Sequence, residues 1–510
     1  MQMKKKFENI LFNLILIILP LIYFLYLNPY REWIENYDQE LWVSYNAVLY
    51  LSNLPQELFD APHFLQIFLL SIFYKILNIF DLLNIKNMND LNTGDLNSNL
   101  QTIIFYTRIY GLILGIFFIL LIKYFINKFI FQNNKYSFFI SLSLIFSGGY
   151  LIHIQQHRVE IITLISFLIA IISLINFIQN QNKKFLFIFT FFFILSIITK
   201  IQIMFYAPLF LVITIFFSKK INYEDFKYLR FNFYFLFFLL GGILISIIFS
   251  SEQLHSTFYL IIYLCLINII FYFVIFKEFT KKIIVIYHLN LFLFISFIII
   301  SLIVFLIPSA TKELFWPFFR ISKIRGHLMG ELTGCCNVIV WLKFFLLYFF
   351  KNIKVVYNNL LLINFVNLLF FEIIFLLVIF RKYLNSKIIV LSVLILFAFL
   401  FLKLIENFRS HMDYYEIYYG WFLLSSIAII LTKLRDKIKS FIIFVTIISS
   451  VLITYKDGFF HYDYQSKNIS FKNQLYYNRI CTEKNFSPMS FWPYWLNKIK
   501  YENVKIYCNW

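Results

Sequence analysis

Charged residues are scarce in this chain. Asp, Glu, Lys and Arg make up 14% of its 510 residues, whereas 61% are hydrophobic. No soluble domain of this size has such a composition, so the bilayer is the expected solvent. Walker-type phosphate loops, HExxH and GxSxG are absent. The five cysteines lack metal-site spacing, and Cys481 and Cys508 are expected to form a disulfide only if the tail that carries them lies outside the cytosol.

Apolar runs of about the 20 residues that a membrane span needs recur along the chain. Thirteen of them are candidate spans: residues 10–27, 102–122, 137–154, 159–178, 185–199, 201–217, 231–250, 257–276, 283–307, 358–380, 388–404, 417–432 and 441–454. Two further runs, 63–80 and 338–350, are ambiguous. The expected fold is therefore all-α, a polytopic transmembrane helical bundle of about 13 spans.

The net charge of +19 is better explained by membrane topology than by nucleic-acid binding, because Lys and Arg mark cytoplasmic loops. With a cytoplasmic N-terminus, and with 63–80 and 338–350 on the outer surface, the cytoplasmic segments hold 22 Lys and Arg against five acids. The outer segment 28–101 then holds three bases and nine acids. The basic start precedes an apolar run without a small-residue cleavage site, which predicts a retained anchor.

This topology predicts a transmembrane domain over 1–454 and a short extracytoplasmic tail over 455–510. Large outer loops occupy 28–101 and 308–357, and the Asn- and Asp-rich stretch 84–101 is expected to be a flexible loop. The absence of eukaryotic signals and the residue bias of an AT-rich genome favour a bacterial inner membrane. The activated substrate is expected to come from this membrane, because the cytoplasmic loops are too short for a nucleotide-binding domain.

Residues 185–217 are too long for one span. A helix of 33 residues would run about 50 Å, against a hydrocarbon core of about 30 Å. The polar residues Thr199, Lys200 and Gln202 mark the expected break. A recessed lysine costs roughly 3 kcal/mol by insertion scales, so Lys200 is expected to have an anionic partner. That partner is either a substrate phosphate or an acid such as Glu160.

Asp38 and Glu40 are the first candidates for chemistry, because they follow the first span and precede a second apolar element. They stand at the start of an expected amphipathic helix, Leu41–Leu51, where the helix dipole favours a carboxylate. One interpretation is an ordinary solvated helix cap. The other is a general base or metal-liganding carboxylate in a cleft at the membrane surface.

Further candidates lie on the same predicted face. Arg108 either snorkels to the interface or contacts a phosphate, and Arg158 and Glu160 are either interfacial or functional. The outer loop 308–337 is unusually basic for its side of the membrane, which suggests an anionic lipid phosphate. The remaining polar side chains that we assign to donor phosphate or substrate binding are Arg320, Arg325, Asp60, His63, Gln202, His411 and Tyr414. Asp60 is equally consistent with an ordinary N-cap.

The order of these elements resembles the GT-C superfamily of membrane glycosyltransferases, including protein O-mannosyltransferases and the aminoarabinose transferase that modifies lipid A. The resemblance covers residues 1–220 and, more loosely, 308–432. It rests on Tyr37-Asp38-Gln39-Glu40, Asp60-Ala61-Pro62-His63, Thr107-Arg108, Arg158-Val159-Glu160, Thr199-Lys200 and His411-Met412-Asp413-Tyr414-Tyr415. The second acidic motif departs from the family, because many relatives have Asp where this chain has Glu160.

The resemblance implies an inverting transfer of a sugar from a polyprenyl-phosphate donor to a lipid, glycan or protein acceptor at the extracytoplasmic face. It implies Asp38 as the general base and Lys200 and Arg158 as phosphate ligands. No cofactor is assigned, and a divalent metal stays open because family members differ in using one. Two alternatives remain: a surface-polysaccharide polymerase or ligase, and a transporter or lipid flippase.

Overall fold

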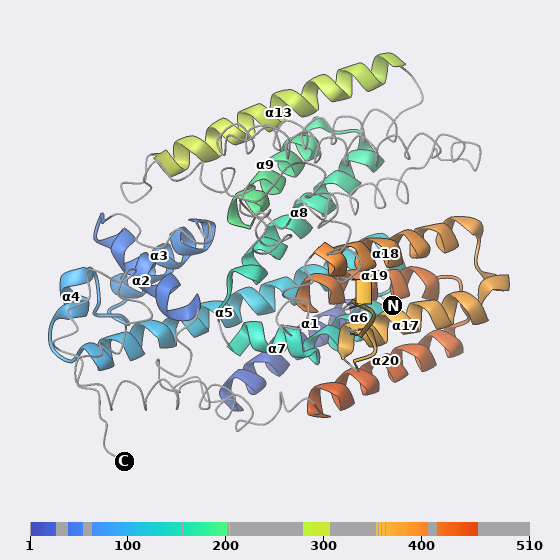
Figure 1. Cartoon of the computed structure of the whole chain (residues 1–510), viewed down its shortest axis with the longest axis horizontal. Coiled ribbons are helices and arrows are strands. Elements are labelled where there is room, and N and C mark those ends of the chain that lie inside the picture. Colours follow the sequence, from blue (N-terminus) through green and yellow to red (C-terminus); the bar gives the residue numbers. More distant parts are fainter. Residues whose placement is uncertain are drawn as a thin grey trace.

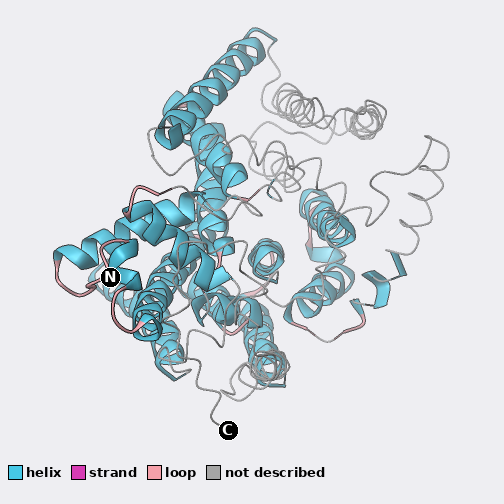
Figure 2. Ribbon diagram, turned by 60° about the vertical axis from the view of Figure 1, so that its left-hand side comes forward, coloured by secondary structure: helices cyan, strands magenta, loops and turns pink. Residues whose placement is uncertain are grey.

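The computed structural model describes residues 2–26, 39–54, 64–155, 157–200, 203, most of 353–362, and the ranges 279–305, 364–405 and 416–456. Within these residues every regular element is a helix, and no strand is present (Figure 2). The helices are α1 (Gln2–Tyr26), α2 (Gln39–Leu51), α3 (Phe64–Ile79), α4 (Met88–Asn92), α5 (Leu96–Ile126) with the π-helical turn η2 (Asn127–Phe131), α6 (Asn134–Ile145), α7 (Gly148–Gln155), α8 (Val159–Asn180), α9 (Lys183–Thr199), α13 (Phe279–Phe305), α17 (Phe365–Ile379) with the 3-10 turn η7 (Arg381–Tyr383), α18 (Ser386–Ile405), α19 (Glu416–Leu431) and α20 (Asp436–Lys456).

In the described part of the chain, four helical segments are long and apolar enough to cross a membrane: Phe7–Tyr26, Ser98–Phe131, Val159–Asn180 and Asp436–Lys456. Shorter apolar helices accompany them, including α3 and parts of α17, α18 and α19. The prediction of a helical membrane protein is therefore supported. These four segments overlap the predicted spans 10–27, 102–122, 159–178 and 441–454. The predicted spans 231–250 and 257–276, all of 201–217 except Ile203, the run 338–350 and both outer cysteines lie outside the described residues.

One predicted span is not a single straight helix. Residues 137–154 were expected to make one helix, but α6 and α7 are separated by a short break and meet at 71°. A bend exposes carbonyl groups that a straight helix would pair, and these need other partners inside a membrane. Hydroxyl groups of α20 supply them: Ser450 donates to the carbonyl of Ser143 at 2.9 Å, and Thr454 donates to that of Phe146.

The expectation of a flexible loop over 84–101 is also wrong. This stretch forms α4 and the beginning of α5. The side chain of Asn87 accepts hydrogen bonds from the N–H groups of Asn89 and Asp90, while Asp90 accepts from the N–H of Asn87. This reciprocal capping box satisfies the N–H groups at the start of α4. Asn and Asp therefore act here as caps rather than as loop residues.

Helix α2 is buried on all sides over residues 43–49, so it is not the amphipathic helix that the sequence suggested. It packs on α3, and both lie against the first part of α5. Figure 1 shows α2, α3 and α4 together near one end of α5, whereas α17, α18 and α20 gather near its other end. The two ends of α5 therefore have different neighbours, early helices near its beginning and late ones near its end.

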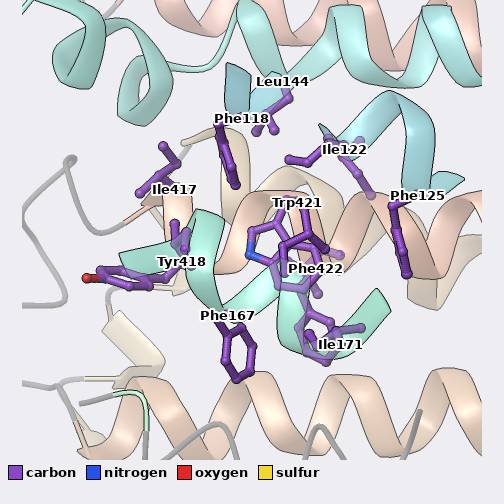
Figure 3. Packing of buried hydrophobic residues seen from close by; sticks show 14 of the residues in the cluster. Phe118, Ile122, Phe125, Leu144, Phe167, Ile171, Ile417, Tyr418, Trp421 and Phe422 are labelled. Atoms are coloured by element: carbon purple, nitrogen blue, oxygen red, sulfur yellow. The ribbon is translucent and has the colours of Figure 1, made fainter. Parts of the chain in front are cut away.

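The central core forms around α19. Trp421 is 2% exposed and packs among side chains of α5 and α8 (Figure 3). The ring of Phe125 lies edge-on to it, with centroids 6.4 Å apart. Because large aromatic side chains bury more area than any others, Trp421 ties a helix late in the chain to the helices that carry the polar residues described next.

Candidate functional site

A buried polar cluster forms where α2 begins, α5 passes, α7 turns into α8, and α9 ends. Its charged members are Glu40, Arg108, Arg158, Glu160 and Lys200, none of them more than 7% exposed. Both carboxylates stand in the first turn of a helix, and Lys200 follows the last residue of one. The helix dipole stabilises each charge at these positions, which is a local reason for the arrangement.

Glu40 and Arg108 make the first ion pair of the cluster. Arg108 Nη2 and Nε each lie 3.2 Å from Glu40 Oε2, and both side chains are fully buried. The other carboxylate oxygen, Oε1, accepts the backbone N–H of His157 at 3.0 Å. Glu40 thus holds together α2, α5 and the turn before α8. The sequence left two alternatives open for Arg108, snorkelling to the interface or a phosphate contact. In the structure its side chain is buried and points to the Glu40 carboxylate.

Hydroxyl groups secure α2 against α3 and α5 close to this pair. Ser44 Oγ lies 2.6 Å from Thr107 Oγ1 and also donates to the carbonyl of Glu40. Tyr74 of α3 bonds to Thr107 and donates to the carbonyl of Ile103 at 3.0 Å. Burial raises the pKa of Tyr74, so its phenol stays neutral. These contacts join the start of α2 to α5 and join α3 to the same part of α5.

His157 occupies the turn between α7 and α8 and is 1% exposed. The amide of Gln66 donates from Nε2 to His157 Nε2 at 2.6 Å, which places the imidazole proton on Nδ1. The ring of Tyr110 meets it edge-on at 5.1 Å. Burial, assisted by the charge of His153 and opposed by Glu160, lowers the pKa of His157 to about 3. The imidazole is therefore neutral at physiological pH.

Glu160 and Lys200 make the second ion pair. Lys200 stands in extended conformation after α9, with its N–H bonded to the carbonyl of Ser196, and its ammonium donates to Glu160 Oε1. Arg158 Nε lies 3.5 Å from the other oxygen, Oε2. The ring of Tyr418 on α19 lies 5.6 Å from the Lys200 ammonium. The predicted end of a helix just before Lys200 is confirmed, and the lysine pairs with Glu160, one of the two partners that the sequence left open. The second half of the predicted broken run, 201–217, lies outside the described residues apart from Ile203.

The described structure brings together five of the residues that the sequence singled out, namely Glu40, Arg108, Arg158, Glu160 and Lys200. The others lie outside the described residues: Asp38, Asp60, His63, Gln202, Arg320, Arg325, His411 and Tyr414. Sequence reasoning gave no role of its own to His157, to Gln66 or to the hydroxyl group of Thr107. The signal available for His157 was its place beside Arg158, between two apolar runs.

The side chains of the cluster do not form a set of metal ligands. Within the described part of the chain, no three His, Cys, Asp or Glu side chains are grouped to hold a metal ion. The oxygens of Glu40 and Glu160 instead face guanidinium, ammonium and amide donors. These two carboxylates therefore fit ion pairing better than metal ligation.

No protein-family model, curated protein or solved structure matches this chain. Its function therefore has to be inferred from the residues of the site and their arrangement.

Proposed function

We propose that this chain is a membrane glycosyltransferase that moves a sugar from a polyprenyl-phosphate donor to an acceptor at the extracytoplasmic face. The acceptor is a lipid, a glycan or a protein. The observation that carries the proposal is the hydrogen bond between His157 and Glu40. It brings Glu40, at the start of α2, beside the turn that carries Arg158 and Glu160, although Glu40 and His157 are 117 residues apart.

We assign different roles to the two acids, Asp38 and Glu40, that the sequence places around the start of α2. Glu40 is buried and both of its oxygens are engaged, so its role is to position the chain. Asp38 precedes it by two residues and is the proposed general base. It removes the proton from an acceptor hydroxyl or amine as that group attacks the anomeric carbon. The bond from this carbon to the donor phosphate breaks, and the lipid phosphate leaves with the electron pair.

The leaving phosphate needs positive charge, and the cluster supplies it. The charged side chains of the described cluster are two carboxylates and three cations, so their net charge is +1 with His157 neutral. Lys200 and Arg158 share Glu160, and an ammonium carries three N–H donors, so the pair with Glu160 does not prevent a second anion from binding. We assign these two cations to the donor phosphate, assisted by Arg320 or Arg325 of the basic loop. Arg108 instead stabilises Glu40.

The experiment uses purified protein in lipid nanodiscs with a panel of polyprenyl-phosphate sugars, and mass spectrometry detects sugar transfer or release. Asp38→Asn should reduce the turnover rate at least about a hundredfold, since a general base contributes about 10²–10⁴-fold to the rate. Asp81→Asn is the matched control. Asp81 is exposed and has a φ of 54°, a conformation that Asn tolerates well. Near-normal turnover of the Asp38 variant would remove the base assignment.

The same assay separates the alternatives. Turnover only with diphosphate-linked donors would favour a polysaccharide polymerase or ligase. Movement of a lipid-linked sugar across liposomes without any bond cleavage would favour a flippase. Neither alternative predicts the loss caused by Asp38→Asn with monophosphate donors.

The role of Lys200 is tested by separating donor from acceptor kinetics. Lys200→Ala should raise the KM for the donor at least about tenfold while leaving the KM for the acceptor close to wild type, because a lost charge-assisted bond costs about 1.5–3 kcal/mol. Glu160→Gln keeps the lysine and removes only its carboxylate partner. Equal changes in both KM values with Lys200→Ala would show that the lysine is purely structural.

A further inference from the structure

A cluster of exposed cations lies at the other end of the bundle from the polar cluster. It comes from two neighbouring turns, the one joining α5 to α6 and the one joining α19 to α20. We call it the cationic rim; its members are Lys128, Lys135, Lys433, Arg435 and Lys437, all of them exposed. The two turns are in contact, because the Lys439 ammonium lies 5.6 Å from the ring of Tyr136.

The rim has little negative charge to balance it. Asp436 is the one acid within residues 127–135 and 433–439, and it is paired with Lys439 at 3.2 Å. Lys128 donates to the hydroxyl of Tyr124 at 2.8 Å, which orients the lysine without neutralising it. No rim cation makes an ion pair within the described part of the chain. Clustered cations of this kind favour a ligand that carries phosphate.

The surface next to the rim identifies the kind of phosphate ligand. Lys437 is followed along one face of α20 by Phe441, Phe444, Ile448 and Leu452, which are 67%, 59%, 39% and 60% exposed. Their spacing of three or four residues places them in line with the lysine. The opposite face of α20 is buried and carries the hydroxyl groups that bond to Glu372, Ser143 and Phe146. Figure 1 shows α20 along the outer edge of the bundle.

We propose that the cationic rim and the exposed face of α20 together bind an anionic phospholipid, with its phosphate at the rim and its acyl chains along Phe441, Phe444, Ile448 and Leu452. A free phosphate would use only the rim, whereas a lipid also covers the apolar stripe directly below it. The lipid site is separate from the proposed sugar-transfer site, so its existence does not depend on the proposed function. Its place among the basic turns assigns it to the cytoplasmic leaflet.

The test measures lipid retained by the full chain in detergent, using native mass spectrometry and short titrations. Phosphatidylglycerol is compared with phosphatidylcholine of the same acyl chains. We expect phosphatidylglycerol to bind more tightly to the wild type, and 0.5 M salt to weaken it. Lys433→Gln with Lys437→Gln should lower its affinity by roughly 10- to 30-fold, since each lysine near an anionic lipid surface contributes about fivefold.

The matched control is Lys183→Gln with Lys184→Gln, which removes two exposed lysines at the turn between α8 and α9. This control should retain phosphatidylglycerol as the wild type does. Equal losses in the two double variants would overturn the site in favour of general charge attraction. Competition by soluble glycerophosphoglycerol as effective as competition by the whole lipid would show a free-anion site and would also overturn the proposal, as would equal binding of the two lipids.

Discussion

The backbone N–H of His157 donates a hydrogen bond to Oε1 of Glu40 across 3.0 Å. The bond joins the beginning of α2 to the turn between α7 and α8. Arg108 of α5 donates to the other oxygen of the same carboxylate, Oε2. Glu40 therefore connects three separate parts of the chain: its own helix α2, α5, and the turn between α7 and α8. A buried carboxylate that loses such partners is costly, so this relationship makes direct predictions about stability.

Removing Arg108 should destabilise the protein strongly. Arg108→Met leaves Glu40 buried without its guanidinium, and loss of one partner of a buried pair costs about 3–5 kcal/mol. The measurement is the midpoint of thermal unfolding in detergent. Replacing both partners, as in Glu40→Met with Arg108→Met, should recover much of the loss, because no uncompensated charge is left. If the single variant unfolds like the wild type, the pair contributes nothing to the fold.

Two glycines of α5 allow α7 and the following turn to come close. A Cβ at Gly115 would lie 2.3 Å from Cγ2 of Ile154, and one at Gly111 would lie 3.2 Å from His157 Nδ1. Their four-residue spacing is the small-residue pattern of closely packed membrane helices. Gly115→Ala should cost about 1–3 kcal/mol through overpacking. The check is a double-mutant cycle with Ile154→Ala, which removes the clashing methyl; additive effects would contradict the packing.

The sequence was sufficient for features that depend on local chemistry. The polar residues around Lys200 in an apolar run of 33 residues predicted the end of α9 at Thr199, and the need for an anionic partner named Glu160 as one alternative. Hydropathy likewise located α1, α5, α8 and α20. These features follow from how many apolar residues fit across a membrane and from the cost of a charge inside it.

The sequence was insufficient where the structure depends on packing between distant segments. Ser147, Gly148 and Gly149 interrupt an apolar run, yet the carbonyl groups freed by a bend there are bonded by hydroxyl groups of Ser450 and Thr454 on α20, a distant segment. The sequence left Arg108 either at the interface or on a phosphate, and the position of α2 brings Glu40 to it instead. The role of His157 could not be predicted, because its partners Glu40 and Gln66 come from two other helices.

His157 predicts a dependence of stability on pH. Burial lowers its pKa from 6.5 to about 3, so the unfolded chain binds a proton that the folded chain does not between these values. The stability of the folded state should therefore be fully present above pH 6.5 and fall as the pH drops toward 3. The loss at pH 5 is about 2 kcal/mol. Unfolding midpoints at pH 8 and pH 5 measure it, with His157→Gln as the comparison.

In the His157→Gln variant the pH 8 midpoint should fall, because the contact with Gln66 changes, but the difference between pH 8 and pH 5 should shrink. An undiminished difference in His157→Gln would assign the pH dependence to other groups.

The bend between α6 and α7 should depend on α20. Ser450→Ala and Thr454→Val each remove a hydroxyl that bonds to a carbonyl of the bent segment, Ser143 or Phe146. Hydrogen bonds between membrane helices contribute about 0.6 kcal/mol on average, and leaving a buried carbonyl unpaired adds to this. Each variant should therefore lower stability by about 1 kcal/mol. Ser449→Ala, which removes a neighbouring hydroxyl that is less buried, is the control.

Because the bend places His157 and Glu160 beyond α7, the double variant Ser450→Ala with Thr454→Val should also reduce sugar transfer. Full activity in a destabilised double variant would show that α8 holds the site without help from the bend.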